Sequence, residues 1–162
     1  MFADIIFLLM VVEVILILTW NSWYYRTGIV VLRAVRAGTG SDATASDLRP
    51  IASDKRSPQL RFKEIGKSCY AFRETPSFGF KIPYLPVMRG VLTFDRQKRT
   101  VEVKGLFNLS IILLVASPLV WTSKGPEFWI AALFAAWAAL SYAIQRTRFR
   151  QVATEAANHA AV

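Results

Sequence analysis

The chain begins with an almost unbroken apolar run from Ile5 to Leu18, which only Glu13 interrupts. A cluster of aromatic residues follows this run, and Arg26 comes directly after the cluster. About 20 apolar residues in a helix cross a bilayer core of roughly 30 Å, and aromatic side chains gather at the membrane interface. We therefore expect an uncleaved membrane-spanning helix here. Its expected interface anchors are Trp20, Trp23, Tyr24 and Tyr25.

Beyond this run, Arg26, Arg33 and Arg36 are spaced by seven and three residues, which would place them on one helical face. The spacing predicts that the first helix continues past the interface, so that residues 1–36 form one region with a bend at Gly28 and its cations toward the headgroups. A simple cluster of charges that stops translocation explains the same pattern. The sequence leaves these two alternatives open.

The middle of the chain changes character twice. Residues 37–58 are rich in small and polar side chains, which predicts a flexible linker. Residues 59–105 contain short runs of strand-type residues separated by turns, and Val101 and Val103 would face one side of their strand. These residues predict a small antiparallel β domain of about five strands whose open face needs cover. The candidate strands are residues 59–66, 68–75, 78–85, 87–95 and 99–105.

Residues 106–145 are again apolar and are divided by a turn at 122–126, which predicts a hairpin of two further spanning helices. Trp121 and Trp129 lie on either side of this turn and are expected as interface anchors. Small residues four apart on the last helix would allow close packing against a neighbouring helix. This alanine stripe consists of Ala131, Ala135, Ala139 and Ala143.

Residues 146–162 are expected to be a basic and then alanine-rich tail. Arg146, Arg148 and Arg150 would end the last span as stop charges. The predicted fold class is therefore a membrane α+β protein. It has one N-terminal and two C-terminal transmembrane helices, with the small antiparallel β domain between the first and second.

The charge distribution suggests an orientation for this topology. The net charge is +9, and residues 26–104 hold sixteen of the twenty Lys and Arg but seven of the eleven acidic residues. By the positive-inside rule, the β domain and the C-terminus would be cytoplasmic and the N-terminus outside, in a bacterial inner membrane. Cys69 is the only cysteine, which fits a reducing compartment.

Glu13 is the sharpest candidate for chemistry, because a charge in the middle of an apolar helix is costly. A proton relay would need more ionisable groups than the other two helices contain. A carboxyl that docks this helix on a neighbour, through an indole N–H such as that of Trp137, is the blander hypothesis and the favoured one. Glu13 and the alanine stripe are thus expected to serve helix packing.

No catalytic, cofactor-binding or metal site is expected. The Gly66–Ser68 segment lacks the earlier glycine and the strand-to-helix context of a phosphate-binding loop. His159 is the only histidine, and Cys69 has no histidine nearby in the sequence, which argues against a zinc site and a thiol nucleophile. We therefore expect a protein that is not an enzyme and that needs no cofactor.

Cations and aromatic residues alternate through the β domain, as in surfaces that bind single-stranded nucleic acid or anionic headgroups. Predicted helices on both sides of the β domain favour the lipid, so no nucleic-acid partner is expected. The basic patch for lipid or partner consists of Arg26, Arg33, Arg36, Arg96, Lys98, Arg99, Lys104, Arg146, Arg148 and Arg150.

The leading functional hypothesis is a non-catalytic accessory or assembly subunit of a larger membrane complex, for which an energy-transducing complex would be a reasonable host. Its partners would be anionic membrane lipids and other membrane protein subunits. A stand-alone regulatory module that responds to anionic lipid is the second hypothesis. A small transporter or proton-conducting subunit that uses Glu13 is the third. No motif in the sequence is specific enough to indicate a family.

Overall fold

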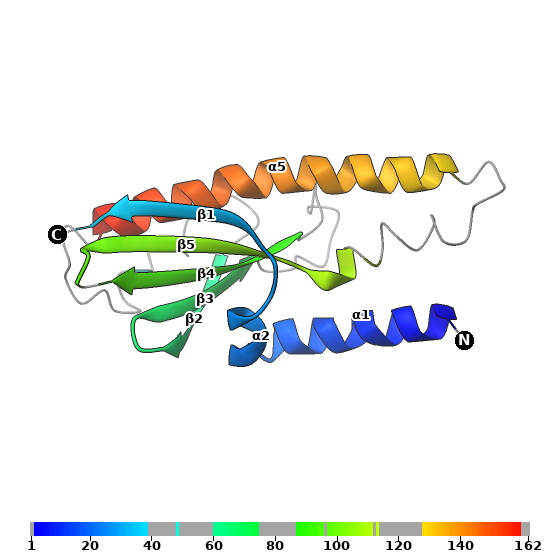
Figure 1. The fold of residues 1–162 in the computed structure, drawn as a ribbon, viewed down its shortest axis with the longest axis horizontal. Coiled ribbons are helices and arrows are strands. Elements are labelled where there is room, and N and C mark those ends of the chain that lie inside the picture. Colours follow the sequence, from blue (N-terminus) through cyan, green and yellow to red (C-terminus); the bar gives the residue numbers. More distant parts are fainter. Residues whose placement is uncertain are drawn as a thin grey trace.

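The computed structural model describes residues 2–38, 48, 60–74, 87–95, 97–111, 113 and 128–159. A β-sheet lies between one long helix on one side and two shorter helices on the other (Figure 1). The helices are α1 (Phe2–Leu18), α2 (Ser22–Arg26) and α5 (Phe128–His159). The strands are β1 (Val30–Ala37), β2 (Leu60–Gly66), β3 (Cys69–Glu74), β4 (Met88–Asp95) and β5 (Thr100–Phe107).

The five strands form one antiparallel sheet in the order β1-β5-β4-β3-β2. Strands β2 to β5 follow one another as a meander, and β1 joins the free edge of β5 across about 70 residues of sequence, with Arg33 opposite Lys104. Side chains alternate between the two faces of each strand. In β5, Val101 and Val103 are buried on the face toward α5, and Thr100, Glu102 and Lys104 alternate with them.

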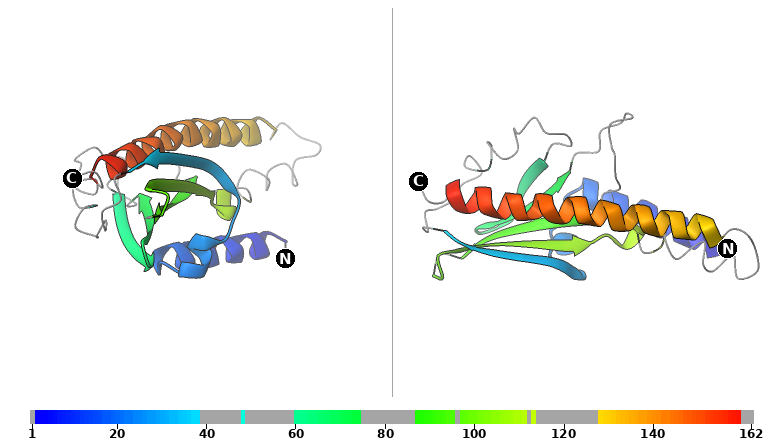
Figure 2. Two further views of the ribbon diagram at one scale, coloured as in Figure 1. Left: turned by 60° about the vertical axis from the view of Figure 1, so that its left-hand side comes forward. Right: turned by 90° about the horizontal axis from the view of Figure 1, so that it is seen from above.

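Helix α5 covers one face of the sheet (Figure 2). Its buried side chains recur at helical spacing, and the Phe149 ring packs at a tilt against the Phe72 ring of β3, with ring centroids 4.8 Å apart. Gly90 of β4 leaves room for the Phe72 ring, which a Cβ at this position would overlap. The buried residues of α5 are Ala138, Ser141, Gln145, Phe149, Val152, Ala153, Ala156 and Ala157. Leu48 is buried in the same core.

A buried polar cluster fixes the register of α5 on the sheet. Gln145 Nε2 donates to Glu74 Oε2 at 2.8 Å, and Arg148 donates to Glu74 Oε1 at 2.9 Å. Gln145 Oε1 also accepts from the backbone N–H of Met88 at 2.9 Å. Because Glu74, Gln145 and Met88 are buried, a sliding helix would leave their polar groups unpaired, at about 1–3 kcal/mol for each group.

The predicted three-span membrane fold is wrong. In the described ranges, no helix is both long enough and apolar enough to cross a bilayer. Helix α1 has 17 residues, which give about 25 Å of helix against a bilayer core of roughly 30 Å. Integral-membrane localisation, with the N-terminus outside and the sheet and tail inside, depended on those spans and is not supported either. The predicted antiparallel sheet is confirmed, with four of its strands where the sequence placed them, but its fifth strand is β1, from the segment predicted as helix.

Two segments differ in secondary structure from the prediction. The predicted helical extension through residue 36 is instead β1, so Arg33 and Arg36 lie on opposite faces of a strand rather than on one face of a helix. The predicted tail after residue 146 is instead the second half of α5, because its apolar residues bury against the sheet.

The remaining predictions concern the candidate strands and the helix expected at 106–121. Four of the five candidate strands coincide with β2 to β5, and the candidate at 78–85 lies outside the described residues. Most of the helix expected at 106–121 also lies outside them.

Candidate functional site

A second hydrophobic cluster lies on the sheet face opposite α5, where α2 packs. The side chain of Asn21 starts α2 by accepting from the backbone N–H of Tyr24 at 3.1 Å. Tyr25 of this helix is fully buried, and its ring stacks on Trp20 with centroids 5.6 Å apart. Aromatic burial thus fixes α2 against the sheet. The buried members are Tyr24, Tyr25, Ala71, Val91 and Leu106.

Arg89 of β4 contacts this cluster from the side of the sheet and is only 3% exposed. Its guanidinium donates to the carbonyls of Tyr24 at 3.1 Å, Thr27 at 2.7 Å and Phe107 at 2.7 Å. It also donates to the Tyr24 hydroxyl at 3.0 Å and lies 3.7 Å from the centroid of that ring. Burial lowers the pKa of Arg89 to about 10, and the nearby Glu13 opposes this shift.

Glu13 is buried and joins α1 to the rest of the protein. Its carboxylate accepts from the Tyr24 hydroxyl and from the backbone N–H groups of Leu109 and Ser110. Trp137, the partner named from the sequence, is not among these donors. Because Tyr24 donates to Glu13 and accepts from Arg89, the three side chains form one chain of hydrogen bonds from α1 to the sheet.

A hollow of about 320 Å³ lies beside α2 on the same face of the sheet. Three cations from separate segments line it: Arg26 at the end of α2, Lys67 in the β2–β3 turn, and Lys104 of β5. No carboxylate is among the described residues that line it. We call it the basic hollow, and its lining is Tyr25, Arg26, Val30, Gly66, Lys67, Cys69, Val91, Thr93, Lys104 and Leu106.

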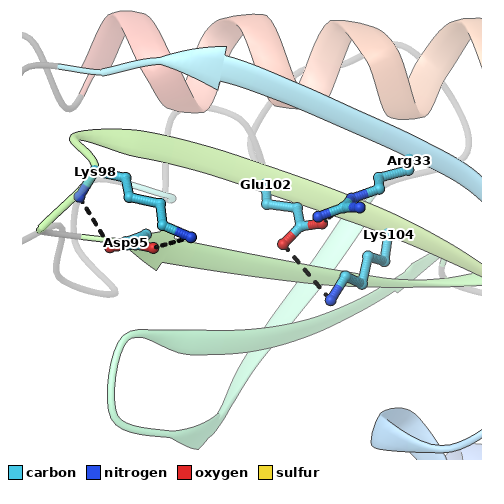
Figure 3. A network of polar contacts seen from close by, with 5 residues as sticks. All are labelled: Arg33, Asp95, Lys98, Glu102 and Lys104. Atoms are coloured by element: carbon cyan, nitrogen blue, oxygen red, sulfur yellow. Dashed lines mark hydrogen bonds and ion pairs between the residues drawn. The ribbon is translucent and has the colours of Figure 1, made fainter.

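Two of these cations are positioned by their neighbours. Arg26 donates to the carbonyl of Ile65 at 2.6 Å, and its guanidinium lies where a Cβ on Gly66 would be 2.5 Å away. Lys104 is 3.5 Å from Glu102, whose carboxylate also pairs with Arg33 (Figure 3). Glu102 therefore holds Lys104 without lining the basic hollow itself.

Polar groups that are not cations also occur in and beside the basic hollow. The Tyr25 hydroxyl is buried and has no hydrogen-bond partner among the described residues. Burial raises the pKa of Tyr25 to about 12, although Arg73 and Arg89 act in the opposite direction. The Cys69 thiol lies 3.8 Å from the Thr93 hydroxyl, so both groups face the same region.

The second unusual feature is the exposed apolar surface of α1. Its inward side presents Ile6, Met10, Glu13 and Ile17, spaced by four, three and four residues. The other sides expose nine apolar side chains, from 38% to 69% each. These are Ile5, Phe7, Leu8, Leu9, Val11, Val12, Val14, Ile15 and Leu18.

The first half of α5 is exposed in the same way and points to the same end of the molecule as the start of α1 (Figure 1). Its large exposed residues are Trp129, Leu133, Trp137 and Leu140. Of the alanine stripe, Ala135, Ala139 and Ala143 are exposed as well, so these three residues face away from the sheet, and the side chain of Ala131 lies outside what the structure describes.

The predicted interface anchors separate into two groups. Trp23 and Trp129 are exposed and Trp20 is half-buried, whereas Tyr24 and Tyr25 belong to the buried cluster. Trp121 lies outside the described residues.

The predicted basic patch is dispersed over the molecule. Arg26 and Lys104 meet at the basic hollow, and Arg33 lies beside Lys104 on the same face. Lys98 pairs with Asp95 at the β4–β5 turn, where Arg99 is also exposed (Figure 3). Arg36 points to the other face of the sheet. On α5, Arg146 and Arg150 are exposed and Arg148 pairs with Glu74. Arg96 lies outside the described residues.

Sequence reasoning missed the buried Arg89 and the role of Lys67. One signal for Arg89 was a cation within an apolar strand, and Gly28 was a second, because its φ of 136° and the nearby guanidinium both exclude a side chain. Lys67 was weighed only as part of a phosphate-binding loop. The structure has a strand-turn-strand here rather than a loop that leads into a helix, yet Lys67 still lines the basic hollow.

Comparisons with protein-family models, curated proteins and solved structures found no match to this chain.

Proposed function

We propose that the protein is a non-catalytic module that binds the surface of an anionic lipid membrane. In this function the exposed apolar residues of α1 enter the boundary between headgroups and acyl chains, and nearby cations contact the headgroups. The observation that carries the proposal is the set of nine exposed apolar side chains on α1. Apolar patches of this kind mark surfaces that contact protein or membrane.

The energetics favour a lipid partner. Burying a fully exposed apolar side chain gains about 1.5–3 kcal/mol, so side chains that are about half exposed gain on the order of 1 kcal/mol each. The net charge of +9 adds attraction to anionic headgroups, at about 1 kcal/mol for each cation near the surface. Apolar burial and charge therefore act together, as they do in helices that lie at a membrane interface.

The junction between α1 and α2 supports the same function. Trp20 follows the end of α1, and the short helix α2 contains Trp23 and ends at Arg26. Aromatic rings prefer the headgroup region because one edge is apolar and the other forms hydrogen bonds. This order of residues suits a segment that passes from the acyl boundary to the charged surface.

Vesicle flotation of the full chain tests the proposal. We expect binding to phosphatidylcholine vesicles that contain phosphatidylserine, and weaker binding at high salt or without the anionic lipid, because salt screens exposed charges. Val12→Ser should weaken binding several-fold, since Val12 lies on α1 and is 43% exposed. Val35→Ser is the matched control, because Val35 is 46% exposed on β1.

Equal binding by the wild type and the Val12→Ser variant would contradict the proposal, and so would the absence of binding to both kinds of vesicle. A wild-type protein that forms a stable larger assembly without lipid, through the surface that contains Val12, would instead favour the accessory-subunit hypothesis.

A further inference from the structure

We infer that the basic hollow binds a phosphate monoester, the anion shared by phosphorylated lipid headgroups and soluble phosphorylated metabolites. The inference deepens the proposed function and depends on it for the lipid as the source of the ligand. It is carried by the convergence of Arg26, Lys67 and Lys104 on one hollow.

The charge balance of the hollow calls for an anion. Arg26, Lys67 and Lys104 come from α2, a turn and β5, so only the fold brings them together. Like charges near one another repel, and the lining described here contains no carboxylate to offset them. Glu102 lies outside the lining and is shared between Arg33 and Lys104. A dianion therefore matches three cations better than a singly charged group does.

The polar groups of the hollow fit the same ligand. A phosphate monoester has several oxygens that accept hydrogen bonds, and arginine binds two of them with its planar fork. Thr93 adds a hydroxyl to the lining, beside the thiol of Cys69. A hydroxyl can donate to a phosphate oxygen, so Thr93 would add to the contacts made by the three cations.

Size and position distinguish the ligand further. A hollow of about 320 Å³ is at the small end of ligand pockets, and it holds a phosphate with part of the attached group. Val30, Val91 and Leu106 give it an apolar side that suits such an attached group. Tyr25 and Arg26 follow directly on the aromatic end of α1, so a lipid headgroup would reach the site from the surface that α1 contacts.

The test uses the full chain and vesicles of two compositions. Phosphatidic acid supplies a phosphate monoester, and phosphatidylglycerol at the same mole fraction supplies a diester. The ratio of the two affinities is the readout, because general attraction between cations and anionic vesicles largely cancels in it. We expect the wild type to prefer phosphatidic acid, and Lys67→Gln to lower the ratio at least fivefold.

Three further variants separate the site from general charge. Lys98→Gln removes the same charge at an exposed turn away from the hollow and should change the ratio less than twofold. Gly66→Ala keeps every charge but displaces the Arg26 guanidinium, and should lower the ratio. Glu102→Gln frees Lys104 and should raise it. Equal ratios for the Lys67 and Lys98 variants would overturn the inference.

Glycerol 3-phosphate in solution distinguishes the two sources of the ligand. Binding of this compound to the wild type but not to Lys67→Gln supports the site even when vesicles show no preference. Vesicle binding without a preference for phosphatidic acid, and without binding of glycerol 3-phosphate, overturns the site and leaves the proposed function standing. Lys67-dependent binding of glycerol 3-phosphate without vesicle binding does the reverse.

Discussion

Replacing Arg89 by methionine tests whether the chain of hydrogen bonds from α1 to the sheet stabilises the fold. Methionine keeps much of the apolar volume and removes all the donors. The carbonyls of Tyr24, Thr27 and Phe107 would each lose a hydrogen bond of 2.7–3.1 Å, and Glu13 would lose the nearby positive charge. Removing one partner from a buried charged network costs about 3–5 kcal/mol. We expect Arg89→Met to lower the free energy of unfolding by about 4 kcal/mol.

Gly28 provides an independent check on the same contact. A Cβ at Gly28 would lie 2.6 Å from Arg89 Nη2, and the φ of 136° is strained for any residue with a side chain. Gly28→Ala should therefore destabilise by about 2–3 kcal/mol, of which the backbone part is independent of Arg89. The steric part disappears once Arg89 is replaced. The double variant should be more stable than the sum of the single effects predicts, by about 1 kcal/mol.

Urea unfolding followed by tryptophan fluorescence measures all three variants. Arg36→Met is the control, since Arg36 is exposed on β1 and its loss should change the free energy of unfolding by less than about 0.5 kcal/mol. A cost for Arg89→Met below about 1 kcal/mol would refute the reasoning. Strict additivity of the Gly28 and Arg89 variants would refute the steric part.

Two further predictions concern stability. Burial raises the pKa of Tyr25 to about 12. The stability that the neutral hydroxyl contributes is therefore present below pH 10 and is lost as the pH rises through 12. Tyr25→Phe should remove this loss. Comparing urea unfolding of both proteins from pH 10 to 12 should show a relative gain of about 2 kcal/mol for the variant, and parallel curves would contradict it. Gly90→Ala should cost about 3 kcal/mol in thermal unfolding, because the buried Phe72 ring is held by Phe149 and cannot yield; an unchanged midpoint would contradict this.

The strands of the meander could be predicted because their information is local. In β5, Val101 and Val103 alternate with polar residues, and the turn before it contains Asp95 and Lys98, which pair in the structure. Strand β1 could not be predicted in this way. The spacing of its arginines fits a helix equally well, and only pairing with β5, some 70 residues later, decides for a strand.

The continuation of α5 was missed for a related reason. Three arginines within five residues resemble the end of a membrane span, although Phe149 among them and Val152 and Ala156 beyond them keep a helical spacing. In the structure, these three arginines lie on two sides of α5. Arg148 pairs with Glu74 at the sheet, whereas Arg146 and Arg150 are exposed. Charge alone therefore did not distinguish a stop signal from an amphipathic helix.

The basic hollow illustrates what sequence patterns leave out, because contacts outside its lining set its shape. Arg89 does not line the hollow, but it donates hydrogen bonds to the carbonyls of Tyr24 and Thr27. These two residues flank Tyr25 and Arg26 in the sequence. The same guanidinium contacts the Tyr24 hydroxyl that donates to Glu13 of α1. One buried arginine thus fixes both the exposed apolar helix and one wall of the basic hollow relative to the sheet. The proposed lipid-binding surface and the proposed phosphate site would need a constant separation, and this chain of hydrogen bonds supplies it.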